Sequence, residues 1–174
     1  MRYNGSFEIA YSSRSERVVT AILYVEPQIL EIRHRNRRYE IGVPHVYLKV
    51  RTFKIKSGTY RPIGIALYAS SRKIRSISSY VAGLPLPNVF YNGHACLGEL
   101  NVTDMETPRL AARRLAFDFL GSRFNNDVGL PRSSLPEEMQ DRFSLYEWQK
   151  MTRKIGVDGI TRLNWPEEYL MHRR

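Results

Sequence analysis

The chain has one cysteine, Cys96, so no disulfide can form within it. A free thiol persists in a reducing compartment, and we therefore expect a cytoplasmic protein. No run of about 18 apolar residues occurs, which predicts that no helix spans a membrane. Residues 1–16 also lack the uninterrupted apolar core that is typical of a secretory signal.

Several motifs of catalytic chemistry are missing as well. The four histidines and Cys96 do not have the spacing of a zinc site. No glycine-rich loop of the Walker or dinucleotide-binding type is present. The acidic pairs at 137–138 and 167–168 stand at expected helix starts, where the helix dipole explains them better than acid–base catalysis.

Acidic residues are scarce relative to basic ones. The chain has 17 Asp and Glu against 27 Lys and Arg, which gives a net charge of +10. Such an excess attracts polyanions or an acidic partner protein, although a solvated basic surface without a partner is the alternative. The densest cluster, and our candidate contact for nucleic acid or an acidic protein, consists of Arg33, Arg35, Arg37 and Arg38, crowded into an expected turn between strands.

What is present indicates one globular domain, residues 1–174, with 43% hydrophobic and 25% charged residues. Short β-branched and aromatic runs separated by turn residues predict strands within 5–81. We expect them at 7–11, 18–25, 29–33, 46–55 and 63–69, with a weaker one at 74–81. The run 46–55 predicts one buried face, and a slip in its alternation between Val50 and Phe53 indicates a bulge.

Helices are expected within 107–174. Thr107 followed by Pro108 is typical of an N-cap and a first-turn proline, and Gly121 is expected to end that helix. Its buried face is expected to hold Leu110, Ala111, Leu115 and Phe119. Capping-box spacing recurs at 134–137 and 144–147, and the apolar stripe of the last helix is expected to close at Gly156. Strands followed by helices predict an α+β fold: an antiparallel β-meander with the helices packed on one face.

The segment between the strands and the helices, residues 83–103, is rich in proline and glycine and contains Cys96. Its pattern resembles the active-site loop of ubiquitin-conjugating (E2-type) enzymes, and more closely that of bacterial E2-like proteins such as the plasmid PRTRC-system B proteins. Residues 119–125, which follow the pattern F-x-x-S-x-F-N, and the order of the elements agree with that family. The loop residues that carry the resemblance are Pro87, Asn88, Val89, Tyr91, Asn92, Gly93, Cys96, Leu97 and Gly98.

The resemblance implies a UBC-like fold and an E2-type transferase from a bacterium or a mobile element. Cys96 would accept a ubiquitin-like modifier as a thioester and pass it to an amine, because a thiol is both a good nucleophile and a good leaving group. The implied partners are an E1-like activating enzyme and a ubiquitin-like protein. No cofactor is needed for this chemistry.

The resemblance also gives roles to the neighbours of Cys96. Asn88 would donate its side-chain amide to the oxyanion intermediate, or it simply caps its own turn. His94 would help to deprotonate an incoming group, or it is a solvent-facing loop histidine. Asp127 falls where the family has an acidic residue flanking the cysteine, or it is an ordinary loop carboxylate. Cys96 itself is either a functional thiol or a buried, inert cysteine.

Two departures from the family leave other functions open. Leu86 stands where eukaryotic enzymes have histidine, and the first residues look extended rather than helical. One alternative is a non-catalytic E2-fold module that binds protein or nucleic acid. Another is a basic nucleic-acid-binding α+β protein in which the motif arises by chance. An exposed Cys96 beside Asn88 favours the enzyme, whereas a Cys96 buried under the last helix favours the module.

Overall fold

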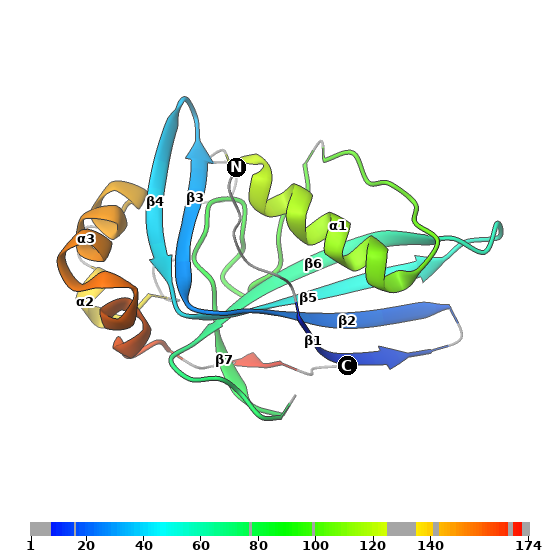
Figure 1. Ribbon diagram of the computed structural model, residues 1–174, viewed down its shortest axis with the longest axis horizontal. Coiled ribbons are helices and arrows are strands. Elements are labelled where there is room, and N and C mark those ends of the chain that lie inside the picture. Colours follow the sequence, from blue (N-terminus) through cyan, green and yellow to red (C-terminus); the bar gives the residue numbers. More distant parts are fainter. Residues whose placement is uncertain are drawn as a thin grey trace.

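The computed structural model describes residues 8–15, 17–76, 78–98, 100–124, 135–140, 143–166 and 169–171. Within them the fold is α+β, with antiparallel strands first and helices afterwards, as the sequence predicts (Figure 1). A larger sheet has the strand order β1-β2-β5-β6-β7-β9, and a smaller one has the order β4-β3-β8. None of the helices in these residues is long and apolar enough to cross a membrane.

The larger sheet contains β1 (Glu8–Arg14), β2 (Val18–Val25), β5 (His45–Lys54), β6 (Tyr60–Ser70), β7 (Tyr80–Gly83) and β9 (Tyr169–Leu170). The smaller sheet contains β3 (Gln28–His34), β4 (Arg37–Val43) and β8 (Arg123–Phe124). The strand pairs are antiparallel except for β3 with β8, which is parallel. The helices are α1 (Pro108–Gly121), α2 (Glu137–Gln140) and α3 (Leu145–Arg162).

The five stronger strand predictions each correspond to a strand, whereas β4 was not expected because its first half is charged. The prediction of a strand at 74–81 is wrong in its first part, since β7 begins only at Tyr80. The backbone N–H of Ile74 donates to the Tyr47 hydroxyl at 2.7 Å instead of to a neighbouring strand. This segment therefore covers the sheet rather than extending it.

The bulge lies on the strand beside the expected one. Thr52 is fully buried and continues the alternation of β5, and its hydroxyl donates to the Val19 carbonyl oxygen at 3.1 Å. The register of β5 against β6 skips Ile63, which makes β6 the bulged strand. The pattern looked broken because a polar residue occupies the core position between Val50 and Phe53.

Helix α1 packs on the inner face of the larger sheet, against β2, β5 and β6 (Figure 1). Its ends are as predicted: the Thr107 side chain accepts a hydrogen bond from the Leu110 N–H, and the helix stops at Gly121. Leu110 was expected on the buried face but is 48% exposed. The buried face consists of Ala111, Ala112, Leu115, Ala116, Phe119 and Leu120.

Helix α3 packs against β4 and not against the larger sheet, so the prediction that both helices cover one face holds only for α1. Gly156 has a non-helical φ of 70° and ψ of 178°, so the first helical segment of α3 ends there as predicted, and a second segment follows it to Arg162. Three side chains of α3 bond the outer edge of β4. The Gln149 Oε1 accepts from the Glu40 N–H at 2.7 Å, and the Thr152 Oγ1 accepts from the Gly42 N–H at 2.8 Å. The Trp148 indole N–H donates to the Gly42 carbonyl oxygen at 2.9 Å.

The larger sheet is apolar on both faces, whereas one buried face was expected. Its second cluster consists of Ile22, Tyr24, Tyr47, Ala66, Tyr68, Val81 and Met171. The Tyr24 hydroxyl and the His45 Nδ1 are 2.7 Å apart at the margin of this cluster, and the Lys73 Nζ lies 4.5 Å from the centre of the Tyr24 ring. The chain after β6 and the C-terminal strand β9 therefore form a cover over the outer face.

Candidate functional site

The segment that contains Cys96 is held against the edge of β6. The Leu67 N–H donates to the Gly93 carbonyl oxygen at 2.8 Å, and the Ala95 N–H donates to the Ile65 carbonyl oxygen at 2.9 Å. Beyond the short strand β7, the chain thus turns back and occupies the next stretch of the same edge. The position of Cys96 is therefore set by the sheet and not by the loop alone.

A short antiparallel ladder brings Asn88 and Cys96 together. Val89 pairs with Ala95, and the Cys96 N–H donates to the Asn88 carbonyl oxygen at 2.7 Å. The two residues are eight positions apart in the sequence but are hydrogen-bonded neighbours in space. The backbones of Asn88 and Cys96 are therefore one strand spacing, about 4.8 Å, apart.

Asn88 also occupies a turn that favours asparagine for backbone reasons. The Val89 N–H donates to the Leu86 carbonyl oxygen at 3.1 Å, and Asn88 has a φ of 65°. Proline followed by a residue with positive φ is the arrangement of a type II turn, in which asparagine is well tolerated. Leu86 and Val89 are both fully buried, so the turn is fixed by packing on either side.

Gly93 closes the loop and admits no side chain. Its φ is 84°, and its N–H donates to the Phe90 carbonyl oxygen at 2.8 Å. A Cβ added at this position would lie 2.8 Å from the Leu67 carbonyl oxygen and 2.8 Å from the Tyr68 ring. Glycine is therefore required both by the left-handed backbone and by the close approach to β6.

Cys96 is a free cysteine outside any strand or helix, and the residue is half-buried. The same loop carries two exposed aromatic side chains: Phe90 is 44% exposed and Tyr91 is 63% exposed. His94 is also exposed, and its backbone N–H donates to the Asn92 Oδ1 at 3.1 Å. Cys96 is therefore not fully buried.

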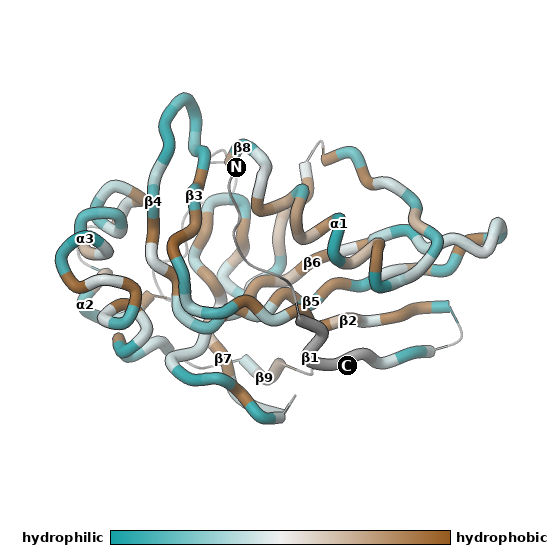
Figure 2. Tube along the Cα trace, in the orientation of Figure 1, coloured by the Kyte–Doolittle hydropathy of each residue, from teal (hydrophilic) through white to brown (hydrophobic). Residues whose placement is uncertain are grey.

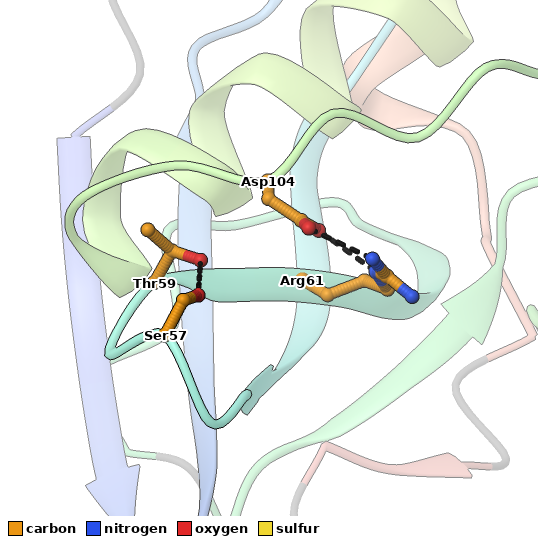
Figure 3. A network of polar contacts seen from close by, with 4 residues as sticks. All are labelled: Ser57, Thr59, Arg61 and Asp104. Carbon is orange, nitrogen blue, oxygen red and sulfur yellow. Dashed lines mark hydrogen bonds and ion pairs between the residues drawn. The ribbon is translucent and has the colours of Figure 1, made fainter.

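The chain beyond the loop is tied to β6 a second time. Met105 and Tyr60 exchange two backbone hydrogen bonds of 2.7 and 3.0 Å. Next to them the Arg61 guanidinium donates to both oxygens of Asp104 at 2.8 Å (Figure 3). These hydrogen bonds lower the pKa of Asp104. The Cys96 segment is thus anchored to one strand on both sides.

The sequence-predicted residues do not all fall in this region. Asp127 lies outside the described residues. The four arginines lie on the β3–β4 hairpin, and only Arg35 lies in the turn itself: Arg33 is the second-last residue of β3, and Arg37 and Arg38 begin β4. Arg33 is half-buried, and the other three are exposed.

Several residues of the Cys96 loop and of the β3–β4 hairpin were not predicted from the sequence. Asp104 gave no signal, because its partner Arg61 is 43 positions away. Phe90 was not among the loop residues that were singled out from the sequence. Arg123 pairs in register with Arg33 through the parallel contact of β3 with β8, which no local pattern indicates. In the described part of the chain, no three His, Cys, Asp or Glu side chains are grouped so as to hold a metal ion.

Comparison of the chain with models of protein families, with curated proteins and with solved structures finds no match.

Proposed function

We propose that this chain is an E2-like carrier, which holds a ubiquitin-like modifier as a thioester on Cys96 and passes it to an amine. The observation that carries the proposal is the 2.7 Å hydrogen bond from the Cys96 N–H to the Asn88 carbonyl oxygen, at a free cysteine that is not fully buried. A partly exposed cysteine held next to an asparagine by a rigid ladder suits acyl transfer better than it suits packing.

The chemistry has two steps. The Cys96 thiolate attacks the thioester carbonyl that joins the modifier to an activating enzyme, and the activating enzyme's thiolate leaves. An amine then attacks the new thioester, the C–S bond breaks, and the Cys96 thiolate is released. Each attack passes through a tetrahedral oxyanion, which a fixed hydrogen-bond donor stabilises. In this proposal the side-chain amide of Asn88 is that donor.

The surrounding residues support the same assignment. Leu86, in the position of the histidine of eukaryotic enzymes, is fully buried, and its packing replaces the hydrogen bonds of an imidazole. In this proposal Phe90 and Tyr91, the exposed aromatic residues of the same loop, shield a thioester on Cys96 from water. His94 and Asp127 remain candidates for orienting or deprotonating the amine. The antiparallel sheet followed by the cysteine loop and α1 is consistent with a UBC-like fold, which is part of the proposal.

The direct test is a charging assay. The purified chain is incubated with ATP, an E1-like enzyme and a ubiquitin-like protein encoded beside it. We expect an adduct that thiol reductant removes, and a Cys96→Ser variant that forms a reductant-resistant ester or no adduct. Failure of the wild type to charge with its cognate enzyme would rule out the carrier function and leave a binding module.

Substitutions at Asn88 separate the donor role from the turn role. Asn88→Gly keeps the positive φ without strain but removes the amide, whereas Asn88→Ala removes the amide and strains the turn. If Asn88 is the donor, both variants slow transfer to an amine by on the order of 100-fold and slow charging less. If Asn88 only shapes the turn, Asn88→Gly transfers at the wild-type rate.

A further inference from the structure

The β3–β4 hairpin carries a second concentration of functional side chains, on a different part of the fold from Cys96. Its outer end extends past α3 (Figure 1), and this end is hydrophilic where the base of the hairpin is apolar (Figure 2). Leu30, Ile32 and Ile41 at the base are buried, whereas Arg35, Asn36 and Arg37 at the end are exposed. The end of the hairpin therefore adds little to the core.

Three arginines form a row across the smaller sheet. Arg33 on β3 faces Arg38 on β4 in the antiparallel register and Arg123 on β8 in the parallel register. In-register residues of adjacent strands project from the same face, so the row runs across β4, β3 and β8. Like charges directly opposite each other destabilise a sheet. One carboxylate, Glu31, lies 3.4 Å from Arg33 and 4.0 Å from Arg38 and offsets only part of this repulsion.

Around the tip of the same hairpin there is a hollow of about 430 Å³. It is lined by His34, Arg35, Asn36, Arg37 and Tyr39. Arg35 and Arg37 have no ion pair within the part of the chain that the structure describes. Arg35 also has a φ of 53°, at a loop position where two-residue hairpins usually have glycine or asparagine. A guanidinium is thus held at the tip against both backbone preference and charge repulsion.

We propose that the hairpin end binds single-stranded nucleic acid. The guanidinium groups of Arg35 and Arg37 contact phosphates, and a base enters the hollow and stacks on the ring of Tyr39 or His34, on the face opposite the arginine row. Proteins that bind single strands combine a cationic track with aromatic stacking platforms in this way. The Asn36 amide supplies a donor and an acceptor for a base edge.

Two features favour a single strand over the other polyanions. An acidic protein would bind the arginines but would not need a hollow lined by the rings of His34 and Tyr39. A duplex keeps its bases stacked, so none of them is free to enter a hollow. The proposal does not depend on the chemistry of Cys96.

The test measures fluorescence anisotropy of a labelled oligothymidylate of about 20 nucleotides, longer than a single binding site, at several salt concentrations. The double variant Arg35→Ala/Arg37→Ala is compared with Arg72→Ala/Arg75→Ala, which removes the same charge from exposed positions after β6. We expect the tip variant to bind about tenfold more weakly or worse, with a salt slope that is smaller by about 1.4. We expect the control variant to stay within about threefold of the wild type, because only distant charge is lost.

A second variant tests the hollow. Tyr39→Leu keeps the apolar contact of this side chain with the core but removes its stacking face. We expect binding to weaken by about tenfold, within the range measured for loss of one stacked base. Circular dichroism and thermal unfolding, unchanged in both tip variants, would show that the loss is local.

Three outcomes would overturn the proposal. The first is equal binding by the tip variant and the control variant. The second is a duplex of the same length that binds as tightly as the single strand. The third is an unaltered affinity in Tyr39→Leu together with equal displacement by polyglutamate, which would assign the surface to acidic proteins. Cys96→Ser is expected to bind the oligonucleotide like the wild type. The nucleic-acid proposal and the carrier proposal can therefore fail or succeed independently.

Discussion

The Cys96 loop and the tip of the β3–β4 hairpin share an unusual feature and differ in how they sustain it. In the described residues, Asn88 and Arg35 are the non-glycine residues with positive φ. Asn88 lies between the buried residues Leu86 and Val89, whereas Arg35 lies among exposed residues. The cysteine loop is therefore shaped by packing, whereas the tip is shaped by hairpin register and by one hydrogen bond, from the Arg35 N–H to the Phe124 carbonyl oxygen at 3.2 Å.

The difference indicates that the cysteine loop holds a fixed geometry and that the hairpin tip presents charge. Asparagine enters the left-handed region readily, so the Asn88 turn costs little. Arginine there costs about 1–2 kcal/mol, and no packing around the tip compensates for it. We infer that the first loop is organised to hold one thiol in one place, and the second to present guanidinium groups to a ligand.

The largest expected effect comes from breaking the packed loop. Gly93→Ala places a Cβ 2.8 Å from the Leu67 carbonyl oxygen at a φ of 84°, and we expect a loss of about 3 kcal/mol in the free energy of unfolding. Gly98→Ala is the matched control, because its φ is 52° but nothing lies within 4 Å of the added Cβ. Urea unfolding should show a loss of about 1 kcal/mol for this control. Equal losses of unfolding free energy in the two variants would mean that the close contact of Gly93 with β6 is unimportant.

The next effect concerns the base of the hairpin. In Thr152→Val the Gly42 N–H loses its acceptor in a buried position, and we expect a loss of about 2 kcal/mol. The control Thr161→Val removes a hydroxyl that only donates to the Val157 carbonyl oxygen within the same helix, and it should cost less than about 0.5 kcal/mol. Trp148 and Trp165 are both buried beside α3, so their fluorescence reports this region. A control as damaging as Thr152→Val would refute the edge-capping role.

The third prediction compares Arg35 and Asn88, the two residues with left-handed backbone, and its expected effect on stability is smaller and of opposite sign. Arg35→Gly removes backbone strain and should stabilise the protein by about 0.5 kcal/mol, while weakening nucleic-acid binding. Asn88→Gly should change stability by less than that, because asparagine is already suited to its turn. Thermal unfolding of the two variants measures the difference. A destabilised Arg35→Gly would mean that the arginine is structural.

The smallest effect is on the pH dependence of stability. The Arg61 hydrogen bonds lower the pKa of Asp104 in the folded protein below its ordinary value of 3.8. The unfolded chain therefore binds a proton more readily, and this contribution is present above pH 3.8 and is lost as the pH falls through the lower, folded-state pKa. Asp104→Asn should show a shallower decline in stability on acidification below that value. Asp158→Asn, at an exposed position, should follow the wild type.

Local sequence patterns predicted the strands and helix ends that are determined by residues close together in the chain. A β-branched and aromatic run located β2, and near-alternation of apolar residues located β5. Thr107 with Pro108 located the start of α1, because an N-cap and a fixed proline φ act within one turn. The proximity of Asn88 and Cys96 was an expectation that came from the resemblance of this loop to that of E2-type enzymes. The geometry agrees with that expectation, while their chemical roles remain predictions.

The remainder depends on contacts between distant residues. β4 is charged in its first half, and it is a strand because β3 pairs with it and α3 bonds its outer edge. The row that joins Arg33 to Arg123 arises from a parallel contact between residues 90 positions apart in the chain. Neither feature leaves a periodic signal in the sequence. The hollow at Tyr39 likewise exists only once the hairpin has closed.

The strand β9 has a consequence for the order in which the protein forms. It pairs Leu170 with Tyr80, and Met171 is fully buried in the outer apolar cluster. The hairpins β1–β2 and β3–β4 close over a few residues and form early, whereas a contact of such long sequence separation is slow. During synthesis this face of the sheet is covered only after residue 171 has emerged from the ribosome. Until then an apolar surface with an open strand edge is available to chaperones or to aggregation.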